Sequence, residues 1–241
     1  MDHPQEFLRI CRKNGLPVDA GQFELVRQYV DLLSTWNSKI NLVSRRDVEN
    51  IWFSHILHSL APWFHVWLPS GWAILDIGSG GGLPGIPLAI LRTDLSIVLL
   101  DSIQKKTKAL TEICTELELP NVQVLNGRAE DVGTKGEYAS RFSAVLARGV
   151  APLVDLIRWS RPFLRRQEGE PTKNGEQRDW APKKLLDAPC LLAWKGGDLE
   201  DEIEHASRKF HRETIDVLPL VIEGGHSPGF EKKQLVVVRF E

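Results

Sequence analysis

The stretch ILDIGSGGGLPGIPLAI, residues 74–90, decides how this chain folds. An apolar run leads to Asp76, glycines follow at positions 78, 80, 81 and 82, and two prolines come after them. A glycine-rich turn directly after a strand lets the backbone come close to a ligand. The stretch therefore predicts the first strand of an open α/β sheet, with a ligand at its carboxyl end.

Short β-rich runs alternate with helical patterns after this strand. The runs cover residues 73–78, 96–101, 121–126, 142–147 and 189–194, and helical spacing covers 84–92, 105–119, 152–164 and 198–210. Such alternation predicts βαβ units in a mostly parallel sheet with helices on both faces. Two last runs, 214–222 and 232–241, have no helix between them and predict an antiparallel pair at one sheet edge. Together the runs predict a seven-stranded, Rossmann-like α/β fold.

In the first 68 residues the spacing of apolar residues is helical, without the β-rich runs of the later part of the chain. Apolar residues recur at helical spacing in 23–37 and in 48–64. We expect residues 1–68 to form a helical extension packed on a main domain that covers residues 69–241. Residues 165–184 are polar and rich in glycine, proline and charge, so they predict an exposed loop inserted in that domain.

Composition sets broad limits on the function. The chain has 241 residues, a net charge of −2 and a pI of about 6.4, which disfavours a general nucleic-acid binder. No apolar run approaches the roughly 18 residues of a membrane span. Three cysteines stand singly, without the spacing of metal ligands, as in a reducing cytoplasm. We expect a cytoplasmic, monomeric protein with no membrane partner and no metal.

The glycines themselves fit two kinds of ligand. Positions 80, 82 and 85 match the G-x-G-x-x-G pattern of dinucleotide sites, yet Pro84 and Pro87 remove donors that a pyrophosphate needs. Asp76 also places a negative charge close to any phosphates. A cationic, phosphate-free ligand with an adenosine end suits the site better, and S-adenosylmethionine is such a ligand. The frame that includes Asp76, Gly78, Gly80 and Gly82 is the acidic-x-G-x-G-x-G pattern of methyltransferases that use it.

Further residues at strand ends complete this interpretation. Asp101 ends the second strand, where its carboxylate can accept the ribose hydroxyl protons, and Ser102 and Ile103 could line the adenine. Ala129 and Glu130 follow the third strand and could sit beside the adenine amino group. Asp101 could instead only cap the next helix, and Glu130 could be ordinary surface.

Several motifs give the chain a family resemblance. It resembles the glucose-inhibited division protein B family, bacterial methyltransferases that modify guanine N7 in 16S ribosomal RNA. The matching pieces are NLVSRRD (41–47), HILHSL (55–60), DIGSGGGLPGIPLAI (76–90), LLDS (99–102), RAED (128–131), ARGVAPL (147–153) and WKGG (194–197). The resemblance implies a class I methyltransferase fold with an N-terminal helical cap, and a substrate in the small ribosomal subunit. It also implies cofactor contacts at Gly78, Leu83, the 101–103 turn, the 129–130 pair and Arg148.

The chain departs from the family pattern in three places. His58 stands where the family usually has an acidic residue, and the 165–184 segment is longer than the usual connection. Lys232 and Lys233 precede the last strand, where the family often has an arginine. None of these positions belongs to the cofactor set.

The expected chemistry agrees with the absence of a catalytic base. Guanine N7 is a lone-pair acceptor with no proton to remove, so methyl transfer needs mainly alignment. We expect Arg148 and Lys195 to act at the reaction centre and to contact RNA, and Arg45 and Arg46 to contact RNA from the helical cap. Each could instead be an ordinary surface or ion-pair residue. His55 and His58 share a helix face, but no further ligand completes a metal set.

Other functions stay open from the residues alone. The enzyme could methylate a small molecule or a protein. A nicotinamide-dependent oxidoreductase is disfavoured by Pro84, Pro87 and Asp76. A non-catalytic ribosome assembly factor could keep the same cofactor pocket.

Overall fold

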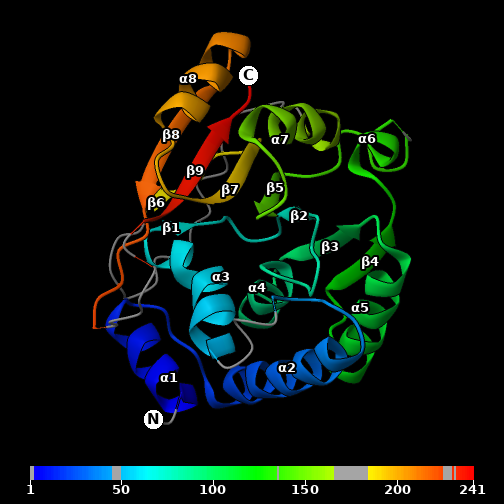
Figure 1. Ribbon diagram of the computed structural model, residues 1–241, viewed down its shortest axis with the longest axis vertical. Coiled ribbons are helices and arrows are strands. Elements are labelled where there is room, and N and C mark those ends of the chain that lie inside the picture. Colours follow the sequence, from blue (N-terminus) through cyan, green and yellow to red (C-terminus); the bar gives the residue numbers. More distant parts are fainter. Residues whose placement is uncertain (1–2, 45–49, 135, 166–183, 225–229, 231) are drawn as a thin grey trace.

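The computed structural model describes residues 3–44, 50–134, 136–165, 184–224, 230 and 232–241. In this part of the chain a seven-stranded sheet has the order β4-β3-β2-β5-β7-β9-β8 (Figure 1). Its strands are β2 (Ala73–Ile77), β3 (Ser96–Asp101), β4 (Val122–Asn126), β5 (Ala144–Arg148), β7 (Cys190–Gly196), β8 (Thr214–Pro219) and β9 (Lys233–Arg239). The pairs from β4 to β7 are parallel, whereas β9 is antiparallel to both β7 and β8. The expected class I methyltransferase fold is confirmed.

The strand order reverses at β2. This strand lies between β3 and β5, and the chain crosses from one side of the sheet to the other after β4. Ligands of open α/β sheets bind at such a point, outside the carboxyl ends of the strands. We therefore expect a ligand to bind at the glycine loop after β2.

Helices cover both faces of the sheet, and each face has its own apolar core. The helices are α1 (His3–Lys13), α2 (Ala20–Lys39), α4 (Gly85–Leu91), α5 (Gln104–Glu116), α6 (Ala129–Val132), α7 (Leu153–Ser160) and α8 (Glu200–Lys209). One core cluster joins the N-terminal helices, α4 and α5 to the sheet, and the other joins α6, α7 and α8 to its opposite face (Figure 1). Successive residues of β3, such as Leu99 and Leu100, enter different clusters, because side chains of a strand alternate between faces.

The N-terminal segment is helical, as expected, but its second part is irregular. A π-helical turn η2 (Trp52–Leu57) continues into α3 (His58–Leu60) and the 3₁₀ turn η3 (Ala61–Phe64). Strand β1 (Val66–Trp67) then pairs with β6 (Lys184–Leu185), which the sequence did not predict. The predicted 165–184 loop lies outside the described residues except at its two ends. The domain boundary at residue 68 stays a prediction, since the N-terminal helices share a core with the sheet.

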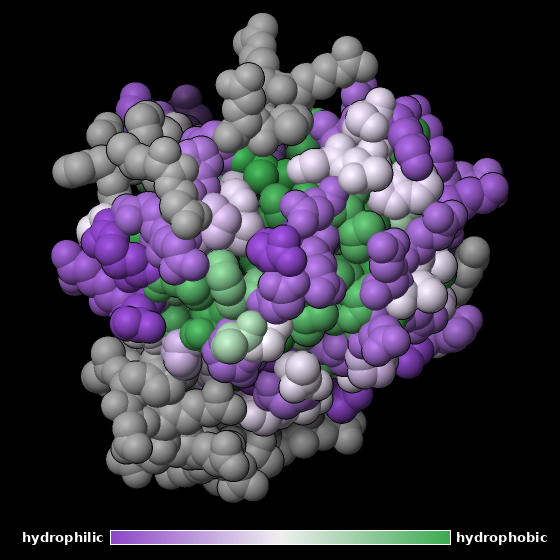
Figure 2. Space-filling view, turned by 90° about the horizontal axis from the view of Figure 1, so that it is seen from below, coloured by the Kyte–Doolittle hydropathy of each residue, from purple (hydrophilic) through white to green (hydrophobic). Residues whose placement is uncertain are grey.

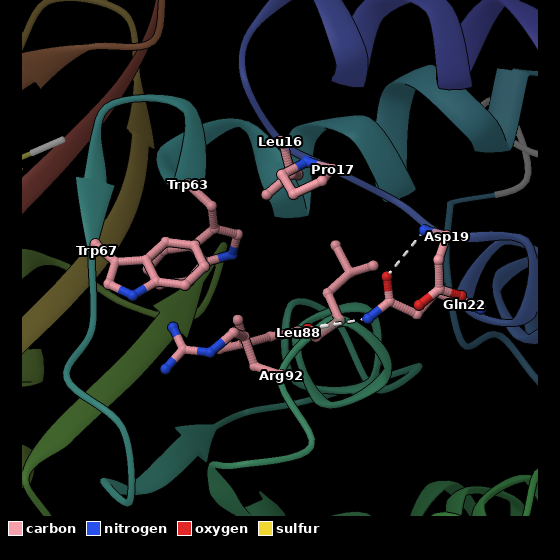
Figure 3. A pocket seen from close by; sticks show the side chains of 9 residues that line it. Leu16, Pro17, Asp19, Gln22, Trp63, Trp67, Leu88 and Arg92 are labelled. Atoms are coloured by element: carbon pink, nitrogen blue, oxygen red, sulfur yellow. Dashed lines mark hydrogen bonds between the residues drawn. The ribbon is translucent and has the colours of Figure 1, made fainter. Parts of the chain in front are cut away.

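The junction between the N-terminal helices and the rest of the molecule contains a cavity of about 210 Å³ (Figure 3). Asp19 and Gln22 form a capping box at the start of α2, and the Gln22 amide also donates to the Leu91 carbonyl at the end of α4. The guanidinium of Arg92 stacks on the Trp67 ring, 4.2 Å from its centroid. Polar contacts thus fix the extension to α4.

The outer face of the extension is mixed in polarity. Seen from the side where α1 and α2 lie, apolar side chains show between polar ones (Figure 2). Among the described residues the exposed large hydrophobic side chains are Ile103, Leu185 and Val221, none of them in α1 or α2. The apolar surface there therefore comes from side chains that are partly buried in the core. In the described part of the chain, every helix is too short or too polar to cross a membrane.

Candidate active site

The glycine loop after β2 turns back on the sheet through left-handed backbone. Gly78 has φ +67° and Gly82 has φ +92°, a region that side-chain-bearing residues rarely adopt. A Cβ added to Gly78 would lie 2.8 Å from a methyl group of Val150. The loop therefore needs glycine both for its turn and for the close approach of the chain that follows β5.

Asp76 lies beneath this loop and is fully buried. Its Oδ2 accepts the Gly85 N–H at 2.9 Å, and its buried Oδ1 has no hydrogen-bond partner among the described residues. Burial raises the pKa of Asp76 to about 7, although the Gly85 hydrogen bond and the charge of Arg148 oppose the change. A buried carboxylate that lacks a partner favours a nearby cation.

Asp101 holds the turn that faces the loop. Its Oδ2 accepts the Gly80 N–H at 2.9 Å and its Oδ1 accepts the Ile103 N–H at 2.8 Å. Helix α5 has no side-chain cap, so Asp101 does not act as the cap of this helix. The carboxylate joins the glycine loop to the 101–103 turn, and each oxygen keeps a second lone pair.

A cavity of about 180 Å³ opens beside these groups. Its walls come from the ends of β2, β3 and β4, the start of α6, the loop after β5, and α7. They are Ile77, Gly78, Leu100, Asp101, Ser102, Gly127, Arg128, Ala129, Glu130, Val150 and Trp159. Five of the expected cofactor residues therefore line one cavity: Gly78, Asp101, Ser102, Ala129 and Glu130.

Other expected cofactor residues have different positions. Ile103 is 41% exposed directly after Ser102, so its side chain is free to cover a ligand. Leu83 is buried in the core cluster that includes the N-terminal helices, and Asp76 lies below the loop. Sequence reasoning missed Arg128, Val150 and Trp159. Arg128 directly follows a strand end and could have been found, whereas Trp159 is brought in by the packing of α7.

Arg148 ends β5 and lies next to His55 of the N-terminal segment. Its Nη2 is 3.2 Å from His55 Nδ1. A guanidinium can only donate, so Nδ1 is the acceptor of this contact. The contact joins residues 93 positions apart in the sequence and orients the guanidinium from the N-terminal extension.

Lys195 lies near the carboxyl end of β7, at the same edge of the sheet, and its ammonium already has hydrogen-bond partners. Its ammonium donates to Glu202 Oε1 at 2.6 Å and to the Ala151 carbonyl at 2.9 Å. Glu202 Oε1 also accepts the Leu153 N–H. These bonds tie α8 to the loop that connects β5 to α7, and an RNA phosphate would compete with them for Lys195.

The remaining site expectations concern histidines and the basic pair. His58 is buried against Phe230, and burial together with the charge of Arg148 lowers its pKa to about 2, so it is neutral. No group of three or more His, Cys, Asp or Glu in the described ranges is placed to hold a metal. Arg45 and Arg46 lie outside the described residues, and their RNA contacts stay a prediction.

Residues 22–171 match the family described as rRNA small subunit methyltransferase G. The chain belongs to this family. A curated relative from Chlorobaculum tepidum, named ribosomal RNA small subunit methyltransferase G, is 38% identical over 237 residues, with 96% of this chain and 95% of the relative covered. A relative of the same name from Phocaeicola vulgatus is 40% identical over 172 residues, with 71% and 72% covered.

A solved structure supports the family's fold. A chain of a fibrillarin/Nop5p complex aligns with a TM-score of 0.55 at 11% identity and covers 78% of this chain and 82% of its own length. At this identity the likeness shows the fold alone. The family match and the fold agree with the resemblance that the motifs indicated.

The residues at the switch point fit S-adenosylmethionine. The unpartnered Oδ1 of Asp76 lies buried beneath the glycine loop, and a nearby cation would favour the ionised form of this carboxyl group. Asp101 offers lone pairs for ribose hydroxyl protons, and Ala129 and Glu130 line the same cavity. Asp101, Ala129 and Glu130, together with the backbone of Gly78, would hold the cofactor.

Proposed function

We propose that this protein transfers a methyl group from S-adenosylmethionine to N7 of a guanine in 16S rRNA of the small ribosomal subunit. The observation that carries the proposal is the cavity at the switch point of β2, where Gly78, Asp101 and Ala129 meet, in a chain of the rRNA small subunit methyltransferase G family. The relatives' name states the RNA class. The guanine and the N7 atom come from the family resemblance of the motifs.

The residues around Arg148 suit this chemistry. When bound, S-adenosylmethionine would supply an electrophilic methyl group on its sulfonium. The N7 lone pair would form the new N–CH3 bond as the S–CH3 bond breaks and S-adenosylhomocysteine leaves, and N7 has no proton to lose. The protein therefore has to align N7 with the methyl group, and no residue has to act as a base. Arg148 lies at the end of β5, the strand that pairs with β2 before the glycine loop. From there its N–H groups would be able to donate to guanine O6 or to a phosphate. His55 keeps the guanidinium in one orientation.

The first experiment uses tritiated S-adenosylmethionine and small subunits from a strain that lacks this gene. Borohydride and aniline treatment then cuts the RNA at N7-methylguanine. One cut in 16S rRNA supports the proposal, and protein-free rRNA run in parallel tells whether the assembled subunit is required. Tight cofactor binding without label in any ribosomal RNA would move the function to another acceptor or to a binding factor.

Substitution of Arg148 tests the residue assignment. Arg148→Ala should reduce methyl transfer severely and leave the fold intact, as judged by circular dichroism. Arg148→Lys keeps the charge but not the planar fork, so it should recover only a part of the activity. Normal activity of the alanine variant would remove Arg148 from the reaction centre.

We also propose that the protein acts as a monomer in the cytoplasm, where small subunits assemble. The few exposed large hydrophobic side chains among the described residues support a monomer. Sedimentation of the purified protein tests this.

A further inference from the structure

The glycine loop has a second neighbour besides the cavity, namely helix α2 of the N-terminal extension. Tyr29 is fully buried, and its hydroxyl donates to the Gly81 carbonyl at 2.7 Å. Burial raises the pKa of Tyr29 well above its ordinary value, so the phenol stays neutral and stays a donor. The bond joins residues 52 positions apart and ends on the backbone of the loop itself.

The end of α2 contacts the same part of the loop. Asn37 is buried, and its Oδ1 accepts the N–H groups of Leu42 and Val43 at 2.8 and 2.9 Å. This turns the chain so that Leu42 lies on the loop: a Cβ added to Gly81 would be 3.4 Å from the Cβ of Leu42 and 2.9 Å from a methyl of Leu33. Gly81 therefore packs against the extension, away from the cavity that Gly78 lines.

The loop transmits this contact to the cofactor side. Gly80, directly before Gly81, donates its N–H to Asp101 Oδ2 at 2.9 Å. Asp101 lines the cavity. The path from the Tyr29 hydroxyl to the carboxylate thus crosses one hydrogen bond, one peptide link and a second hydrogen bond.

We propose that Tyr29 is a positioning residue for the methyl-transfer site: it fixes the glycine loop so that Gly80 holds the Asp101 carboxylate where the cofactor's ribose binds. Asn37 supports the same loop through Leu42. The inference rests on the proposed use of S-adenosylmethionine.

The test compares the two tyrosines of the chain. Tyr29→Phe removes only the hydroxyl that reaches the loop. Tyr138→Phe is the matched control, because Tyr138 is also buried and its hydroxyl contacts Gln123, away from the loop. Loss of one net hydrogen bond should weaken S-adenosylmethionine binding in Tyr29→Phe about fivefold, measured by calorimetry without RNA. Tyr138→Phe should bind like the unmodified protein.

Methylation kinetics and hydrogen exchange separate positioning from a plain structural role. In Tyr29→Phe the KM for S-adenosylmethionine should rise about fivefold, while kcat at saturating cofactor changes less than about twofold. In the cofactor-free protein, peptides that contain residues 78–83 should exchange about fivefold faster than in the Tyr138→Phe control.

The outcomes distinguish this inference from the proposed function. Unchanged affinity and loop exchange in Tyr29→Phe would overturn the inference even if the melting temperature falls, since Tyr29 would then be a core contact only. An equal loss in both tyrosine variants would overturn it as well. Failure of the unmodified protein to bind S-adenosylmethionine would instead reject the proposed function, and the exchange comparison would still test the support of the loop.

Discussion

Replacement of Asp76 by asparagine should make the cofactor-free protein more stable at alkaline pH. Burial raises the pKa of Asp76 from 3.8 to about 7. For such a group folding favours the protonated form, so its contribution to stability is full below pH 4 and is lost as the pH rises to about 7. Each tenfold change in the acid constant corresponds to about 1.36 kcal/mol, so ionised Asp76 destabilises the fold by about 4 kcal/mol at pH 8.

Asparagine keeps an oxygen for the Gly85 N–H and has no charge to bury. Any cost of its buried amide group is the same at every pH. We therefore compare the free energies of unfolding of Asp76→Asn and of the unmodified protein, both measured in urea. From pH 5 to pH 8 their difference should change by about 2.5 kcal/mol in favour of the variant. The cofactor's positive charge favours ionised Asp76, so the variant should also bind S-adenosylmethionine more weakly at pH 8.

Asp94→Asn provides the matched control. The ion pair with Arg92 lowers the pKa of Asp94 below its ordinary value of 3.8, so this carboxylate is ionised in both states above pH 5. Its variant should differ from the unmodified protein by the same amount at pH 5 and at pH 8. A constant difference for Asp76→Asn as well would refute a raised pKa at that position.

Two further comparisons test the loops after β2 and β5. Gly78→Ala and Gly149→Ala both force a side chain into backbone with φ +67°, which destabilises each by about 1–2 kcal/mol, but only the first also meets Val150. Thermal denaturation should rank Gly78→Ala as the less stable, and calorimetry should find that it alone loses cofactor affinity. Lys195→Met and Glu202→Gln should each reduce methyl transfer about tenfold if the ion pair holds the loop; a loss in the lysine variant alone would show that Lys195 contacts RNA directly.

The sequence predicted those features that depend on local order. Alternation of β-rich and helical runs gave the parallel strands, and the missing helix before residue 232 gave the antiparallel pair β8 and β9. Parallel strands that follow one another bring their carboxyl ends to the same edge of the sheet. This rule predicted that the cavity is lined by Gly78, Asp101 and Ala129, which each come at or just after a strand end. The β1–β6 pair was missed because two-residue strands carry no periodicity.

The orientation, hydrogen bonding and pKa of the site residues depend on partners that lie far away in the sequence or cannot be read from it. Arg148 was predicted at the reaction centre, yet its orientation comes from His55, which belongs to the N-terminal extension. Lys195 was predicted to act at the reaction centre and to contact RNA, but its ammonium is bonded to Glu202, on the helix that follows its strand. Asp76 was found through its motif, but its raised pKa follows mainly from its burial in the folded chain, to which the charge of Asp101 adds. Sequence motifs thus locate the chemical groups, whereas packing between distant segments decides which of them is charged, oriented or free to react.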